Sequence, residues 1–298
     1  METLKNKIDF AVVVTVKNAN PNGDPLNGNR PRINYDGTGE LSDVCIKRKI
    51  RNRLMDTGKS IFVQSDDNKV DDYKSLRARV DGELKDVKMD DENKYREAVC
   101  KKWLDVRAFG QVFAFKGASS KKSKKDSNEE QSEDKSVSIG IRGPVSVQSA
   151  FSVSPINITS IQITKSVSGE GDGSKKSSDT MGMKHRVDFG TYVFYGTMNP
   201  QLASKTGFND DDAKAIKDAI IKLFQNDSSS VRPEGSMEVY KVYWWEHNCK
   251  NGQYSSAKVH RSLEITLKSD VNEPSNINDY DIKINELDGL KLEIYDGQ

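Results

Sequence analysis

The 298-residue sequence lacks several features that mark large classes of protein. It has no apolar run long enough to cross a bilayer, and its first residues, Met-Glu-Thr-Leu-Lys, lack the apolar core of a secretory signal. Cysteine is scarce, and Cys45, Cys100 and Cys249 are far apart, which fits a reducing compartment better than a disulfide framework. We therefore expect a cytoplasmic protein with no membrane partner.

Soft metal ligands are also scarce. His247, Cys249 and His260 form the only loose cluster in the sequence, and they do not complete the usual tetrahedral set. We expect no metal and no other cofactor.

An excess of one charge is absent as well. The 46 Lys and Arg residues nearly cancel 45 Asp and Glu residues, and the formal net charge is +1. The total charge therefore gives no indication of a nucleic-acid partner, and any basic surface must be local. The length allows one large domain or two small ones, with enough chain to bury a core.

One local basic element is present at residues 43–56. Ser42 is a good N-cap, Asp43 is favoured by the helix dipole in the first turn, and Gly58 supplies a left-handed stop, so the sequence predicts a helix. Its apolar residues recur at helical spacing and form one ridge: Ile46, Ile50 and Leu54. Its cations cover the remaining surface: Lys47, Arg48, Lys49, Arg51 and Arg53.

This crowding of cations has two interpretations. Like charges four residues apart repel by a few tenths of a kcal/mol, so helix stability alone would not select the pattern, and a polyanion would relieve it. A solvated helix face is the alternative, because most charge runs are solvated.

A long loop leads into this helix. Residues 8–17 alternate apolar and polar and predict a half-buried strand, and residues 18–32 are rich in Asn, Gly and Pro. Long loops of this kind are often functional. Asn20, Asn22, Gly23, Arg30 and Arg32 are its candidate ligand contacts, and a flexible connector is the alternative.

A long hairpin is predicted over residues 154–186, with a flexible tip. Met181 and Met183 lie beside Lys184, His185 and Arg186, a combination that suits an arm that wedges between bases while its cations hold phosphates. An ordinary surface hairpin is the alternative. Residues 116–136 are almost entirely polar, so we expect a disordered loop there, mobile and solvated, with transient nucleic-acid contact as the weaker alternative.

The remaining elements predict an α+β fold. Residues 60–64 look like a strand, residues 91–104 a helix, and residues 106–115 a strand with Gly110 as a bulge. The order strand (8–17), helix (43–56), strand (106–115), strand (187–196), helix (210–225), strand (236–245) is a split βαβ pattern. It predicts a ferredoxin-like (RRM-like) palm, with helices on one face of an antiparallel sheet. Aromatic RNA-recognition signatures are absent, so binding is expected on helix and loops.

Seven short motifs occur together in this chain. They are residues 20–25 (Asn-Pro-Asn-Gly-Asp-Pro), 42–52 (Ser-Asp-Val-Cys-Ile-Lys-Arg-Lys-Ile-Arg-Asn), 105–110 (Asp-Val-Arg-Ala-Phe-Gly), 141–145 (Ile-Arg-Gly-Pro-Val), 181–185 (Met-Gly-Met-Lys-His), 188–192 (Asp-Phe-Gly-Thr-Tyr) and 232–237 (Arg-Pro-Glu-Gly-Ser-Met). In this order they resemble the backbone subunit of type I-C CRISPR surveillance complexes (Cascade). The resemblance runs from about residue 8 to residue 250, and residues 116–136 are the main stretch without a match.

The resemblance implies a hand-shaped, non-enzymatic subunit: a single RRM-like domain over residues 1–298, a finger insertion at about residues 59–105, and a hairpin thumb. Copies would line up head to tail along one CRISPR RNA as an open filament, with bases presented to target DNA. Further partners would be the large, small and 5′-handle-capping subunits. The implied RNA contacts are Lys47, Arg48, Lys49, Arg51, the loop from Asn20 to Asp24, and Met181, Lys184 and His185 of the thumb.

Two rival interpretations stay open. Backbone subunits of type III complexes are metal-dependent endoribonucleases that use an aspartate after the first strand, and Asp24 and Asp36 lie in that region. A lone RNA-binding module that forms no filament is the other.

Overall fold

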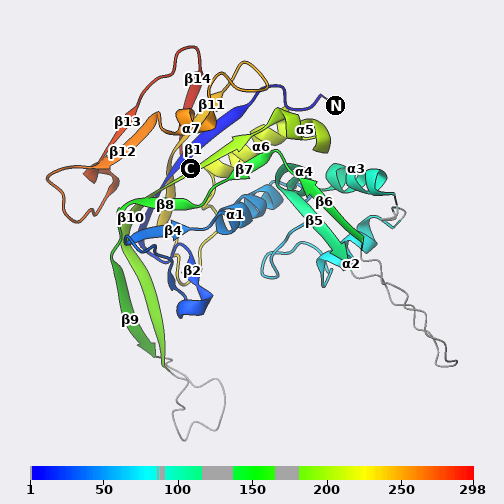
Figure 1. The fold of residues 1–298 in the computed structure, drawn as a ribbon. Helices are drawn as coiled ribbons and strands as arrows, with labels where there is room; N and C mark the ends of the chain where they lie inside the picture. The colour runs from blue at the N-terminus through cyan, green and yellow to red at the C-terminus, as the bar shows by residue number, and fades with distance from the viewer. Residues whose placement is uncertain (1, 86, 88–90, 116–136, 165–180) are drawn as a thin grey trace, which may run out of the picture.

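The computed structural model describes residues 2–85, 87, 91–115, 137–164 and 181–298 (Figure 1). The loop predicted at residues 116–136 and the predicted hairpin tip at residues 165–180 lie outside the described residues. The described chain is a mixed α+β structure built on one large antiparallel sheet, which confirms the predicted fold class at that level.

The large sheet has eight strands, in the order β14-β11-β1-β10-β8-β4, with β7 and β9 also pairing with β10. Their bounds are β1 Ile8–Ala19, β4 Thr38–Leu41, β7 Val145–Val147, β8 Ala150–Pro155, β9 Ile158–Thr164, β10 Met181–Met198, β11 Met237–Glu246 and β14 Lys291–Asp296. Every pairing among them is antiparallel. β1 and β10 form the centre, paired from Ile8 opposite Met198 to Ala19 opposite Val187.

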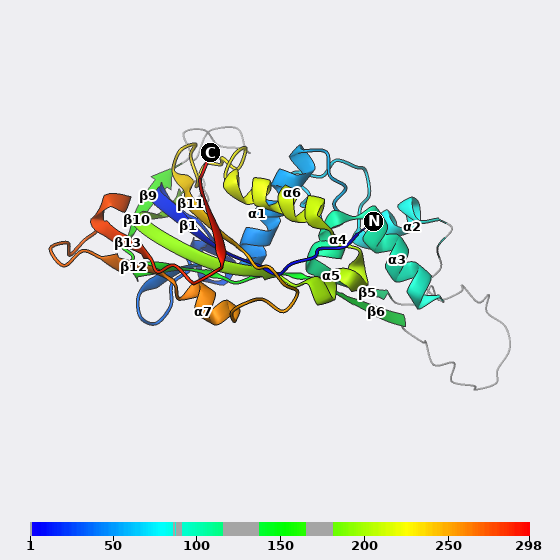
Figure 2. The ribbon, with the colours of Figure 1, turned by 90° about the horizontal axis from the view of Figure 1, so that it is seen from above.

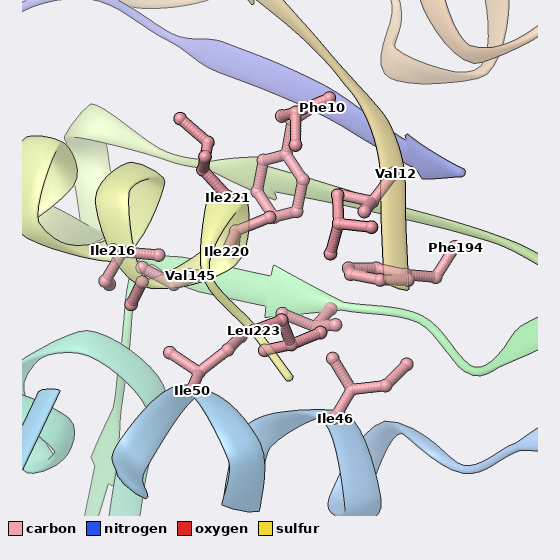
Figure 3. Packing of buried hydrophobic residues seen from close by; sticks show 14 of the residues in the cluster. Phe10, Val12, Ile46, Ile50, Val145, Phe194, Ile216, Ile220, Ile221 and Leu223 are labelled. Atoms are coloured by element: carbon pink, nitrogen blue, oxygen red, sulfur yellow. The ribbon is translucent and has the colours of Figure 1, made fainter. Parts of the chain in front are cut away.

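Two helices cover one face of this sheet: α1, Asp43–Asp56, and α6, Asp210–Ile221. Figure 3 shows Ile220 of α6 beside Phe10 of β1, with Ile50 of α1 projecting into the same apolar interior from the other side. The short helix α5, Pro200–Thr206, precedes α6. Burying an aliphatic side chain of this size stabilises a fold by about 2 kcal/mol, so this face holds the helices firmly.

The opposite face is also covered. Helix α7, Ser256–His260, and the hairpin of β12, Leu263–Leu267, with β13, Tyr280–Ile284, lie there (Figure 2). Ala11 and Val13 of β1 are consequently buried, although the sequence pattern predicted a half-buried strand. That prediction is wrong because the C-terminal segment covers the face that alternation assigned to solvent. The 3-10 turn η3, Ile277–Asp279, leads into β13.

A second, smaller core lies beside the large sheet. It is formed by α2 Leu76–Glu83, α3 Glu92–Lys102, α4 Leu104–Phe109, β5 Gly110–Phe115 and β6 Val137–Arg142. β5 pairs only with β6 among the described strands, so the predicted strand at residues 106–115 does not join the large sheet. Residues 106–109 are helical, and Gly110, at φ 80°, ends α4 instead of forming a bulge.

A small ladder lies in the loop after β1. It has two strands, β2, Gly23–Asp24, and β3, Arg30–Pro31, around the 3-10 turn η1, Pro25–Asn27. Within the described ranges, none of the helices combines the length and apolarity that a bilayer crossing requires.

Candidate nucleic-acid interface

Helix α1 has the bounds and the apolar ridge that the sequence predicts. The Ser42 side chain accepts a hydrogen bond from the Cys45 N–H, and Gly58 adopts φ 78° just beyond the last turn. Ile46, Ile50 and Leu54 are each 0% exposed against the sheet. The helix is therefore fixed on its apolar side, with its cations arranged around the rest of its surface.

Each cation of α1 has an aspartate partner within the chain. The pairs are Lys47–Asp43 (2.8 Å), Arg48–Asp67 (3.0 Å), Lys49–Asp227, Arg51–Asp105 (2.9 Å) and Arg53–Asp56 (2.6 Å). The sequence pattern predicted repulsion among these cations that a polyanion would relieve. Carboxylates of the same chain already offset this repulsion, so the repulsion alone does not require a polyanion. The choice between a phosphate-binding face and a solvated face stays a prediction.

Lys49 points into the protein. Its side chain is 4% exposed, it pairs with Asp227, and its ammonium lies 5.4 Å from the Phe224 ring centroid. Burial lowers the pKa of Lys49, against the attraction of Asp227. A phosphate contact by Lys49 would require this pair to open, and the prediction that Lys49 binds RNA stays untested.

Arg51 is tied to a buried carboxylate. Asp105 is 1% exposed and accepts from Arg51 Nε at 2.9 Å and from the Phe62 and Val63 N–H groups at 2.7 and 3.0 Å. These two amides are thus bonded to a side chain, which is why residues 60–64, predicted as a strand, form none. Arg51 joins α1 to the smaller core.

Lys47 and Arg48 are the more accessible cations of the helix. Their side chains are 25% and 55% exposed, and both partners, Asp43 and Asp67, are also open to solvent. Exposed pairs of this kind contribute about 0–1 kcal/mol, so a phosphate can replace the carboxylate at little cost.

The loop after β1 is held by its own asparagines. Asn20 is buried and donates from Nδ2 to the Asn29 carbonyl at 2.6 Å, and Asn22 Oδ1 accepts from the Ser42 N–H at 2.9 Å. A Cβ on Gly23 would lie 2.0 Å from Asn29 Oδ1 and 3.0 Å from the Asn29 carbonyl oxygen, so any larger residue would displace the Asn29 side chain. The alternative of a flexible connector is wrong for these residues, because the loop is bonded to itself and to the start of α1.

The loop also reaches the hairpin of β9 and β10. Arg30 donates to Ser160 Oγ at 2.9 Å and lies 3.4 Å from His185 Nδ1, and Ser160 and His185 are 2.8 Å apart. His185 is only 9% exposed, so its ring fastens the hairpin to the loop. Met181 and Met183, at 59% and 56%, are exposed on the same face of β10 as each other. Lys184 is partly exposed on the opposite face.

The aspartates of the nuclease hypothesis serve as turn caps. Asp24 accepts from the Leu26 N–H, and Asp36 accepts from the Thr38 N–H and hydroxyl. The Thr38 hydroxyl and amide lower the pKa of Asp36. Within the described ranges, no group of three His, Cys, Asp or Glu residues is arranged to hold a metal ion.

A buried charge cluster on the opposite face was missed by the sequence reasoning. His247 Nε2 lies 2.8 Å and His260 Nε2 3.5 Å from the carboxylate of Asp9, whose side chain is 0% exposed, and Lys7 lies 3.2 Å away. Burial alone raises the pKa of Asp9, but hydrogen bonds from His247 and His260 outweigh it and hold this pKa well below its usual range. Cys249, the third residue of the suspected metal cluster, is exposed. The alternation of residues 8–17 placed Asp9 on the face assigned to solvent, so it gave no signal that this carboxylate is buried.

The fold and these contacts define an α+β protein in which one loop joins a basic helix to a long hairpin. The family model for "CRISPR-associated protein Cas7" matches residues 6–285, and the chain belongs to this family.

One curated protein and two solved structures are similar to this chain. A CRISPR-associated protein Cas7 from Haloferax volcanii is 26% identical over 233 residues, which cover 76% of this chain and 67% of that protein. A chain of a solved "CRISPR RNA-guided surveillance complex, pre-nicking" is 14% identical, with a TM-score of 0.50 over 89% of this chain and 84% of the other. It shows a shared fold. A chain of a second "CRISPR RNA-guided surveillance complex" is 15% identical, with a TM-score of 0.40 over 80% and 68%.

Proposed function

We propose that this chain is the CRISPR RNA-binding backbone subunit of a type I-C surveillance complex, Cascade. Membership of the Cas7 family supports the general role. The seven ordered motifs, from residue 20 to residue 237, support the subtype. The three free cysteines are in keeping with a cytoplasmic location.

The sheet supports a ferredoxin-like palm. β1 and β8 both run antiparallel to β10, so they are parallel to each other with β10 between them, and α1 lies on the connection. β10 and β11 are related in the same way across β1, with α6 on their connection. This is a split βαβ arrangement in which β8 takes the place that the sequence assigned to residues 106–115. On this proposal residues 59–105 belong to the finger and residues 154–186 to the thumb.

One observation carries the proposed site: the loop after β1 is bonded at one end to the basic helix and at the other to the hairpin. Asn22 bonds the start of α1 at Ser42, and Arg30 bonds Ser160 and His185. Three segments that the sequence assigned separately to RNA binding are therefore physically joined.

Within this site the exposed residues make the contacts. Lys47 and Arg48 neutralise phosphates, Lys184 adds a third cation, and Met181 wedges between bases. Asn20, Asn22 and Gly23 shape the loop that presents its amides. Sequence is read by base pairing, so backbone and shape contacts are sufficient for the protein.

Assembly follows from the same proposal. Copies pack head to tail on one guide RNA, an open arrangement whose length the RNA sets. The particle then presents the guide to target DNA, together with the large, small and 5′-handle-capping subunits.

We propose no catalytic role. Asp24 and Asp36 are both engaged in local turns, and neither has carboxylates gathered around it in the described structure. Incubation of the assembled particle with complementary RNA and Mg²⁺ is expected to leave the RNA intact. Cuts at regular spacing would favour the endoribonuclease instead.

The RNA contact is tested by the salt dependence of affinity. Lys47→Ala with Arg48→Ala is expected to reduce the slope of log affinity against log salt by about 1.4, since each single-strand phosphate contact contributes roughly 0.7. Lys250→Ala with Arg261→Ala, which removes the same charge from exposed positions near the opposite face, is the control. An unchanged slope in the first variant would remove these cations from the site. Arg51 is unsuitable for this test because its loss leaves Asp105 buried without its ion-pair partner.

A further inference from the structure

Two neighbouring cavities lie where α5 meets the end of β6, and Lys47 lines the larger one. One has a volume of about 530 Å³ and is lined by Lys47, Arg142, Ser146, Thr197 and Asn199, among others. The other, about 210 Å³, is lined by Arg96, Arg142 and Lys205, among others. Both are lined by Ile141, Arg142 and Leu202, so they adjoin one another, and we call the two together the Arg142 groove.

The charged residues that line this groove are all basic. Four of its lining residues are cations, Lys47, Arg96, Arg142 and Lys205, and no aspartate or glutamate lines either cavity. The whole chain has 46 basic and 45 acidic residues, so this segregation is a local feature. The Ser146 hydroxyl and the Asn199 amide add neutral hydrogen-bond donors, whereas the Thr197 hydroxyl already donates to the Ile8 carbonyl oxygen at 3.0 Å.

Two of these cations differ from those of α1. Arg142 and Lys205 are exposed, and neither forms an ion pair with any carboxylate that the structure describes. Lys47 and Arg96 have partners, Asp43 and Glu92, but both pairs are partly open to solvent. Within the described residues, the groove therefore combines open space with two cations that have no carboxylate partner, whereas the cations of α1 are each paired.

The backbone fixes Arg142 in place. Arg142 ends β6 opposite Gly110, where α4 gives way to β5. A Cβ on Gly143 would lie 2.2 Å from the Ala108 carbonyl oxygen, and one on Gly110 would lie 2.3 Å from the Ile141 carbonyl oxygen. This close approach of two backbones, which only glycine permits, holds the start of the Arg142 side chain at the seam between the two cores.

We propose that the Arg142 groove binds the phosphodiester backbone of a nucleic acid, with Arg142 and Lys205 as its principal contacts. A guanidinium presents a planar fork of donors that matches phosphate oxygens, and an unpaired cation has no internal partner to lose. The groove includes Lys47, so it continues the face of α1, and this continuity favours a nucleic acid over an acidic protein segment. The inference rests on the proposed function and extends its site toward α5.

The experiment compares Arg142→Ala with Lys205→Ala against wild type and against Lys250→Ala with Arg261→Ala, which has the same net charge. One arm measures the salt dependence of binding of the purified chain to single-stranded RNA of guide length. A second arm preassembles the particle on its guide and measures the salt dependence of target-DNA binding. Arg142→Gln with Lys205→Gln repeats both arms with larger neutral side chains, in case the alanine variant folds poorly.

We expect the groove variants to lower the salt slope by about 1.4 relative to the control, roughly 0.7 for each lost phosphate contact. A loss in the RNA arm assigns the groove to the guide, and a loss only in the DNA arm assigns it to the target. Slopes equal to the control in both arms overturn the proposal. So does reduced particle assembly with unchanged slopes, which would indicate an acidic segment of another subunit. Failure of wild type itself to bind RNA would instead overturn the proposed function.

Discussion

The guanidinium of Arg30 lies 3.4 Å from Nδ1 of His185, and both groups contact Ser160 Oγ. Because a guanidinium only donates hydrogen bonds, the imidazole nitrogen that faces it accepts. Arg30 comes from the loop after β1, and the other two residues come from the hairpin. This contact ties the hairpin to the loop, which is itself bonded to the start of α1.

Arg30→Ala is therefore expected to loosen the hairpin without unfolding the protein. Losing this partly exposed, charge-assisted contact costs about 1 kcal/mol, or roughly a fivefold rise in local opening. Hydrogen exchange should accelerate at the β9–β10 amides near Ser160 and His185 and remain unchanged in β11. Arg186→Ala, one residue from His185, is the control. Equal acceleration in both variants would show that Arg30 has no special role.

Asp105 is expected to be essential for stability. Its carboxylate is buried and neutralises Arg51 while it accepts from two amides. Asp105→Ala leaves these donors unpaired and should lower the free energy of unfolding by about 3 kcal/mol, as measured by urea denaturation. Asp67→Ala removes the exposed partner of Arg48 and should cost less than about 1 kcal/mol. Similar losses in the two variants would contradict this ranking.

The buried carboxylate of Asp9 should make the free energy of unfolding depend on pH in the acid range. Its folded pKa lies below the ordinary aspartate value of about 3.9, so its stabilising contribution is complete above that value and is lost as the pH falls below it. Between pH 5 and pH 3, the free energy of unfolding should fall more steeply in wild type than in Asp9→Asn. The difference approaches about 1.4 kcal/mol per pH unit for one proton. Asp270→Asn, at an exposed position, should keep the wild-type slope, and parallel curves for wild type and Asp9→Asn would contradict the prediction.

Substitution of Lys49 should lower the stability of the protein and leave its RNA binding unchanged. Lys49→Met leaves Asp227 with only Arg232 as its partner and should lower the free energy of unfolding by about 2 kcal/mol. Because the side chain is buried, the salt slope of RNA binding should stay at the wild-type value. Asp227→Asn should give a comparable loss of stability by leaving the ammonium without its carboxylate. A slope reduced by roughly 0.7 in Lys49→Met would show that Lys49 does reach a phosphate.

Local signals in the sequence were sufficient to predict α1 and its bounds. The cap at Ser42, the ridge of Ile46, Ile50 and Leu54, and the stop at Gly58 all lie within one short stretch, and the helix has the predicted bounds. The partners of its cations were not predictable in the same way. Asp227 is 178 residues from Lys49 and Asp105 is 54 residues from Arg51, so only the folded chain brings them together.

The smaller core shows a different limit. Residues 106–109 were predicted as the start of a strand, but Leu104 and Ala108, four residues apart, are both buried in helix α4. A window that began at Val106 omitted Leu104 and with it the helical spacing. In the large sheet, β8 occupies the position beside β10 that the sequence assigned to residues 106–115. Residues 110–115 instead pair only with β6 among the described strands. Strand partners of this kind depend on contacts far along the chain.

Native mass spectrometry of the chain with RNAs of graded length tests most directly whether it is a filament-forming backbone subunit. The number of copies per RNA should rise in regular steps as the RNA lengthens, because each copy covers a fixed segment and the open interface adds copies until the RNA ends. A single bound copy at every RNA length would contradict this role and leave the chain as a lone RNA-binding module.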